Sequence, residues 1–523
     1  MSLILVDGIK DRPGTGGPKF PNGLHLPAGI GITGDGHINM AGVCTFSGNV
    51  TIGGTLTYED VTNIDSVGII TANTGINVVA NGINVQAGIL TAKNIIDASD
   101  AQYNTRVGGN AGNSFDGTNA THNTLIGYDA GTAITGGDRN TVVGSLAGDA
   151  LTTGSYNTAI GYLSLSVCTT GTHNVAVGDN ALNDNTGNYN TAVGQGALYE
   201  NSTASNNTAV GYAALQLNTT ASNNTAVGYN ALLANTTGDQ NAALGKSALA
   251  ANTTASNQTA MGFNALTANT TGAANSAFGS GALAANTTAN DNTAIGAGAL
   301  QANTTGAYNT AVGRMSLMTA TTVSYNTALG YAALKLSTTG ASNTALGAEA
   351  LDTLTTGSSN VAVGGEALDD CTTGGQNTAV GTQALQTSTT VSNQTAVGYQ
   401  ALKSSTTGGE NTAVGYIALK DNTTGNRNTA CGIFALENNT TGSDNTAIGR
   451  NTLAANTTTS NNTAVGKDAL AANTTGYQNT AVGANALDAN DAGYENTAVG
   501  YNCLSDVTDG DHNTAVGHDA LEN

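Results

Sequence analysis

The stretch Asn224-Thr-Ala-Val-Gly-Tyr-Asn-Ala-Leu-Leu-Ala-Asn-Thr-Thr-Gly-Asp-Gln240 decides the fold, because the sequence on both sides of it repeats the same pattern. The next unit begins at Asn241, and counting in both directions finds twenty-five units from Asn104 to the end of the chain at position 523. Nearly every step is 17 residues; one early step is 19 and another is 16. A period held this strictly indicates identical structural units stacked in register.

The length and composition of the unit favour a β-solenoid. Helical repeats take about 33 to 47 residues for their helices, and a 17-residue unit with Gly, paired Thr and Asn clusters is too short for them. We expect an all-β, parallel β-solenoid of about 25 coils, with two short strands per coil near Thr225 to Tyr229 and Ala231 to Ala234. Asn and Thr side chains suit ladders between stacked coils. At ~4.8 Å per coil the stack would be about 120 Å long.

Three positions of the unit are nearly constant and are predicted to form structural ladders. The fifth residue is always Gly, the fourth is always apolar and the ninth is Leu from Leu165 onward. Strand alternation predicts that Val227 and Leu232 fill the interior and that Ala226 and Gly228 form an outer strip of small residues. The ladder residues chosen as representatives are Gly211, Gly228, Gly245, Val227, Ala226, Leu215, Leu232 and Leu249.

The predicted outer strip has a consequence for assembly. A soluble monomer exposes apolar patches of at most a few hundred Å², and a strip along the whole rod would exceed that. We therefore expect two further copies of the chain to cover it around a threefold axis.

The first hundred residues differ from the repeats in composition and in the spacing of apolar residues. All four prolines lie in the first 27 positions, and short apolar runs then alternate with turns up to position 103. These features predict three regions: an extended attachment arm (1–27), an intertwined β-rich shaft (28–103) and the repeat solenoid (104–523).

Charge and hydropathy argue against several partners. The net charge is −21 with only 14 Lys plus Arg, whereas binding to nucleic acid or anionic lipid requires a basic surface. No apolar run approaches the ~18 residues of a membrane helix, and residues 1–10 lack the features of a secretion signal. We expect no nucleic-acid binding and no membrane insertion.

No pattern in the sequence indicates catalysis, a cofactor or a metal. The six histidines match no catalytic or metal motif, the five cysteines show no paired spacing, and we expect packing roles for the cysteines. Acidic residues gather near the C-terminus, where oxygen ligands for calcium are conceivable, but a solvated surface is the favoured interpretation. Tyr follows the constant Gly in eight units; packing over a neighbouring coil is favoured over contact with a glycan. The prediction is a non-enzymatic protein with no cofactor, and no receptor-binding residue can be named.

Two resemblances add to this interpretation. Asn-Thr-Ala-Val-Gly followed by Ala-Leu is similar to the repeats in the head of trimeric autotransporter adhesins, of the YadA-like type, over residues 104–523. That resemblance implies a left-handed β-roll assembled as a homotrimer, although the unit of that family is shorter. The segment from Phe46 to Thr71 resembles the shaft of structural and tail-fibre proteins of marine phages, cyanophages in particular. It implies attachment to a virion tail or baseplate protein through the N-terminal region, with the distal part meeting a host receptor or glycan.

The leading functional prediction is therefore a structural fibre of a virion, a tail fibre that spaces or displays host-receptor binding. The alternative is a bacterial surface adhesin or an extracellular filament subunit, located at the cell surface. The Thr content also suggests an ice-binding solenoid, but its flat face would need Thr at i and i+2, whereas Thr236 and Thr237 are adjacent and point apart.

Overall fold

The computed structural model describes residues 102–115 and 119–522. The predicted arm (1–27) and nearly all of the predicted shaft (28–103) lie outside the described residues and stay predictions. The described part contains strands and turns only, so no helix in it could span a membrane.

Each coil contributes one strand of three residues. The strands are β1 (Thr105–Val107), β2 (Thr124–Ile126), β3 (Thr141–Val143), β4 (Thr158–Ile160), β5 (Val175–Val177), β6 (Thr191–Val193), β7 (Thr208–Val210), β8 (Thr225–Val227), β9 (Ala242–Leu244), β10 (Thr259–Met261), β11 (Ser276–Phe278), β12 (Thr293–Ile295), β13 (Thr310–Val312), β14 (Thr327–Leu329), β15 (Thr344–Leu346), β16 (Val361–Val363), β17 (Thr378–Val380), β18 (Thr395–Val397), β19 (Thr412–Val414), β20 (Thr429–Cys431), β21 (Thr446–Ile448), β22 (Thr463–Val465), β23 (Thr480–Val482), β24 (Thr497–Val499) and β25 (Thr514–Val516).

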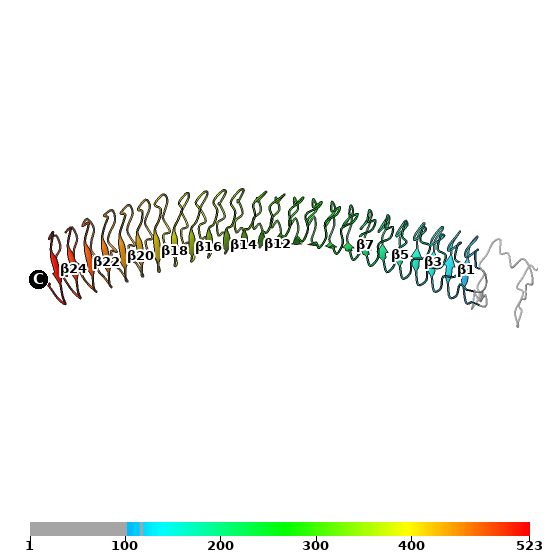
Figure 1. Ribbon diagram of the computed structural model, residues 1–523, viewed down its shortest axis with the longest axis horizontal. Helices are drawn as coiled ribbons and strands as arrows, with labels where there is room; N and C mark the ends of the chain where they lie inside the picture. The colour runs from blue at the N-terminus through cyan, green and yellow to red at the C-terminus, as the bar shows by residue number, and fades with distance from the viewer. Residues whose placement is uncertain (1–101, 116–118, 523) are drawn as a thin grey trace, which may run out of the picture. The chain divides into compact units, whose positions relative to one another are not determined.

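The strands form one parallel sheet along the stack, as Figure 1 shows. Each strand pairs with its counterparts in the coils before and after it, so that Thr225 lies between Thr208 and Ala242. The register is kept across the irregular early step, where Thr105 pairs with Thr124. The predicted parallel β-solenoid with about 25 coils and 17 residues per coil is confirmed; its left-handed winding and threefold assembly stay predictions.

The prediction of a second strand in each coil is wrong. Residues Ala231 to Ala234 form turns, because Asn230 and Leu232 adopt the left-handed backbone conformation, with φ of 54° and 51°. Two left-handed residues so close together prevent an extended strand. The segment still bonds to the next coil: the Leu232 amide donates to the Ala248 carbonyl at 2.9 Å.

In the first predicted strand, the inward and outward positions of Ala226 and Val227 are the reverse of the prediction. Ala226 is fully buried, whereas Val227 is half-buried and points outward beside Thr225. Leu232, with Leu215 and Leu249 in the neighbouring coils, is fully buried as predicted. The interior is a thin layer that a methyl group opposite the Leu ladder already fills. The bulkier branched residue is therefore outside, and the predicted outer strip of Ala226 and Gly228 does not exist.

Two buried ladders of Asn line the same interior. In the first ladder, the backbone amide of Asn157 donates to Asn140 Oδ1 at 2.9 Å, and Asn140 Nδ2 donates to the Gly154 carbonyl at 2.9 Å. In the second ladder, Asn235 Nδ2 donates to Asn218 Oδ1 at 3.0 Å. Hydrogen bonding offsets the cost of burying these amides, which confirms the predicted Asn ladders.

The constant Gly of each coil is explained by its backbone. Gly228 has φ of 139°, and a Cβ at this position would lie 2.5 Å from the Gly245 carbonyl oxygen of the next coil. Both the conformation and the close approach exclude other residues. The same geometry recurs at Gly211 and Gly245.

Candidate functional site

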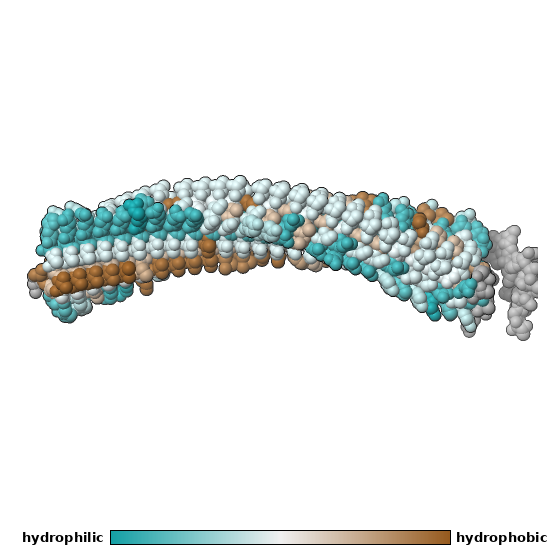
Figure 2. Space-filling view, viewed as in Figure 1, coloured by the Kyte–Doolittle hydropathy of each residue, from teal (hydrophilic) through white to brown (hydrophobic). Residues whose placement is uncertain are grey.

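The outer face of the strands carries a continuous apolar ladder, formed by the last residue of β1 to β25. We call it the strand-face ladder. Fifteen members are exposed: Val107, Ile126, Ile160, Val193, Leu244, Met261, Phe278, Ile295, Leu329, Leu346, Val414, Cys431, Ile448, Val482 and Val516. The other ten are half-buried. Figure 2 shows a hydrophobic strip along the strand side of the C-terminal half of the stack.

The second outward row of the strand face carries no charge. The first residue of every strand also points outward, and it is Thr, Ser, Ala or Val in all coils. With ~4.8 Å per coil and a width of about 8 Å for the two rows, the face covers roughly 900 Å². This area, of which the apolar ladder is one of two rows, is comparable to the ~800 Å² that one partner contributes to a standard interface.

The exposed Tyr side chains pack against each other along the stack. Tyr212 and Tyr229 stack with ring centroids 5.1 Å apart, and Tyr399 and Tyr416 stack at 5.5 Å. Stacking covers one face of each ring, so these pairs present less ring face to a glycan. The favoured prediction, packing over a neighbouring coil, is confirmed for these four residues.

Five acidic side chains meet on the turns of two successive coils. Asp369 is half-buried, and burial together with the charges of its neighbours raises its pKa to about 6. These neighbours are Asp370, Asp352, Glu349 and Glu366. Gln383 Nε2 donates to Glu366 at 2.9 Å, and Lys335 pairs with Asp352 at 3.6 Å. The cluster is thus partly compensated by protein groups.

The acidic residues near the C-terminus do not form one cluster, although Asp488 and Asp506 lie close enough for their charges to interact. Asp488 and Asp506 lie on the turn that follows the strand, whereas Asp511 accepts a hydrogen bond from the Tyr494 amide at 3.0 Å before the next strand. His512 pairs with Glu495 at 3.0 Å, and His518 with Asp519 at 2.7 Å. In residues 102–115 and 119–522, no group of three or more His, Cys, Asp or Glu is arranged to hold a metal ion.

The cysteines of the described residues are all free thiols. Cys168, Cys371 and Cys503 are buried, and burial raises the pKa of Cys168 and of Cys371 to about 11. Such thiols stay protonated and pack as small apolar side chains, as predicted. Cys431 differs, because it is exposed and belongs to the strand-face ladder.

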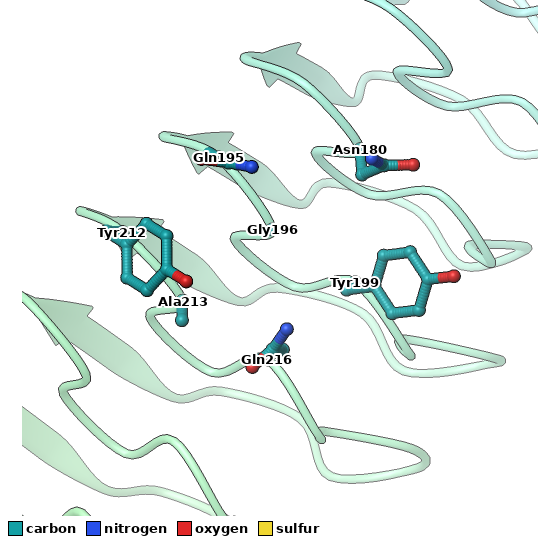
Figure 3. Close-up of a pocket in the computed structure, with 7 residues that line it drawn as sticks. All are labelled: Asn180, Gln195, Gly196, Tyr199, Tyr212, Ala213 and Gln216. Atoms are coloured by element: carbon teal, nitrogen blue, oxygen red, sulfur yellow. The ribbon is translucent and has the colours of Figure 1, made fainter.

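Two shallow grooves interrupt the other side of the stack, and the sequence reasoning missed both. Each lies where the seventh residue of a coil is Gly: Gly196 in the first groove, Gly281 and Gly298 in the second. The first, of about 280 Å³, opens between Gln195, Tyr199 and Tyr212, as Figure 3 shows. The second, of about 350 Å³, spans several coils. The signal was present in the sequence, since other coils carry larger residues at this position.

The second groove, which we call the Gly281–Gly298 groove, has unlike ends. Phe263 stands at one end, and Lys246 Nζ lies 5.8 Å from its ring centroid in the preceding coil. Arg314 and Met315 stand at the other end, and the Arg314 guanidinium lies 5.9 Å from the Tyr331 ring. Gln301 is exposed within the groove. The groove thus combines an aromatic ring, a thioether, an amide and a cation.

Comparison with known proteins adds no family. No protein-family model matches the chain, and a search of curated proteins finds no match.

Proposed function

We propose that this chain is a structural fibre of a virion, a tail fibre that spaces or displays host-receptor binding. The observation that carries the proposal is the unbroken stack of twenty-five coils with one charge-free apolar ladder along its strand face. A stack with the same residues at every level suits a spacer, because it holds its ends at a fixed distance. The resemblance of the segment from Phe46 to Thr71 to phage fibre shafts supports the location in a virion.

The fibre is proposed to be a parallel homotrimer joined along the strand-face ladder. Water contacts the strand face, roughly 900 Å² of apolar and Thr side chains, in the single chain, and burial of its apolar ladder against other copies is favourable. Side-by-side copies in the same direction place all N-terminal regions at one end, where the proposed shaft meets a tail or baseplate protein. The predicted threefold axis is therefore kept, but the strand-face ladder replaces the strip of Ala226 and Gly228 as its surface.

The virion location is tested by mass spectrometry of purified particles. The particles to purify are those of a virus in whose genome capsid and baseplate genes lie beside the gene for this chain. The chain should be a component of them, and particles that lack it would overturn the proposal. A secretion gene cluster in the neighbourhood would favour the alternative, a cell-surface adhesin.

Assembly is tested on the purified full chain by light scattering and by labelling of Cys431. The mass should be three times the 51.6 kDa of one chain. Cys431 is exposed in the single chain, so its peptide should be protected from a thiol reagent in the assembly and labelled after unfolding. A mass of one chain with rapid Cys431 labelling would contradict the homotrimer.

A further inference from the structure

We propose that the Gly281–Gly298 groove binds a short acidic saccharide, one that bears carboxylate or sulfate groups. The inference rests on the proposed function for its biological meaning, since it names the ligand class that the fibre would display a site for. Its physical basis is separate and lies in the groove itself.

The groove exists because two successive coils lack the side chain that most other coils carry at the seventh position. A Cβ added at Gly281 would lie 3.8 Å from the nearest atom, Gln301 Nε2, and a Cβ at Gly298 would lie 3.5 Å from Gln301 Oε1. A Cβ at either glycine would therefore meet only the Gln301 side chain, at van der Waals distance, so there is room for it. From Phe263 to Arg314 the groove spans three coil steps, about 14 Å, and it is shallow, with a volume of about 350 Å³.

The ends of the groove present complementary chemistry to a sugar. Lys246 lies against Phe263 from the preceding coil, and Ser280 and Gly281 follow in the next coil, so one side of the ring faces the groove. The C–H face of a sugar ring packs on such an aromatic face. The side chains of Asn264, Ser280 and Gln301 make no hydrogen bond within the described residues. They are free to bond sugar hydroxyls.

Charge around the groove selects an anionic ligand. Between Asp239 and Glu349 the only charged residues are Lys246, Asp291, Arg314 and Lys335, three positive and one negative. This stretch has a net charge of +2 in a chain whose net charge is −21. Arg314 forms no ion pair within the described residues and stands at the end of the groove. Guanidinium groups bind carboxylate and sulfate oxygens with two parallel hydrogen bonds.

The experiment is calorimetric titration of the purified full chain with three disaccharides: one with a uronic acid, one sulfated and one neutral. Saturable binding of a charged disaccharide, weaker by about tenfold or more for the neutral one, is expected. The preference between the two charged probes identifies the anionic group. Absence of saturable binding, or equal binding of the neutral probe, would overturn the proposal.

Two variants locate the binding. Gly281→Asn fills the groove with a residue that the preceding coil holds at the same position, Asn264, with φ of 55°, so the fold is retained. It should weaken binding by about tenfold or more, and Arg314→Gln by about fivefold. Gly196→Asn, which fills the other groove, is the matched control and should leave binding unchanged.

If Gly281→Asn binds like the unmodified chain, or if Gly196→Asn abolishes binding, the assignment to the Gly281–Gly298 groove is wrong. Binding to the purified chain is measured without virions. If the chain is absent from virions but still binds the saccharide, only the proposed function is refuted. If the chain is present in virions but does not bind the saccharide, only the groove proposal is refuted.

Discussion

The strand face and the groove side of the stack follow opposite rules. On the strand face, every coil presents an apolar residue at the end of its strand, and no coil presents a charge at either outward position. On the groove side, the residues after the constant Gly vary from Tyr to Lys, Arg, Ser and Gly, and they open grooves in two places. Uniformity along the length suits association with an identical stack, whereas local variation suits one ligand at one level.

The largest effect should come from charges placed on the strand face. The triple change Ile295→Asp, Val312→Asp and Leu329→Asp puts three carboxylates in adjacent rungs of the proposed interface. Burying unpaired charges is so costly that the assembly should dissociate to single chains, as measured by light scattering.

The matched control for this change is Thr305→Asp, Thr322→Asp and Thr339→Asp. These residues belong to the same three coils and are exposed on a turn away from the strands. The control should keep the mass of the unmodified protein. Equal masses for both triple variants would contradict the strand-face interface.

Two glycines of one coil separate a structural position from an open one. Gly279→Ala places a Cβ 2.7 Å from the Gly296 carbonyl group at φ of 133°, and should destabilise the stack by about 3 kcal/mol or more. Gly281→Ala adds a methyl at van der Waals distance from Gln301 Nε2, at φ of 68°, and Ala332 already occupies this position in another coil with φ of 55°. We expect a loss of about 1 kcal/mol for Gly281→Ala, from backbone strain alone. Thermal unfolding followed by circular dichroism measures both, and similar losses would contradict the difference.

Truncation should cost more inside the coil than on its strand face. Leu300→Ala removes a fully buried side chain and should destabilise by about 3 kcal/mol. Val312→Ala, at a half-buried position, should cost about 1 kcal/mol when assembly is prevented by the Asp changes at Ile295 and Leu329. Denaturant unfolding of the dissociated protein provides the comparison. A larger loss of stability for Val312→Ala than for Leu300→Ala would contradict the outward position of Val312.

The smallest effect concerns pH and the acidic cluster on the groove side. The pKa of Asp369 is raised to about 6 from its ordinary value of 3.8, so the folded state binds the proton more tightly than the unfolded state. Its stabilising contribution is complete below about pH 4 and is lost as pH rises through about 6. Asp369→Asn should stabilise the protein at pH 7 by about 1 kcal/mol or less, because the side chain is partly exposed and solvent screens it.

Thermal unfolding between pH 4 and 7 checks this expectation. The difference between Asp369→Asn and the unmodified protein should grow with rising pH. Asp509→Asn, an exposed position outside the cluster, is the control and should show no such trend. A constant difference would mean that the charge of Asp369 is already compensated.

The sequence by itself determined the period, the class of fold and the ladders of Gly, Leu and Asn. A 17-residue repeat that holds its register from Asn190 to the end of the chain indicates coils stacked in register. Gly228, Leu232 and their counterparts could be predicted because each coil repeats the same local requirement. The sequence also marks the positions of the grooves by Gly196, Gly281 and Gly298. A Gly alone, however, does not tell whether open space or a neighbouring backbone lies beside it.

Only the tertiary structure decided which strand face is inside. Alternation of residues fixes that Ala226 and Val227 point to opposite sides, but it gives no direction. The direction depends on the left-handed conformation of Asn230 and Leu232, which returns the chain so closely that the interior holds Ala and Leu but not a second branched row. The volume between two turns of backbone is a property of the closed coil. It placed Val227 on the surface, where it became part of the ladder proposed to join the chains.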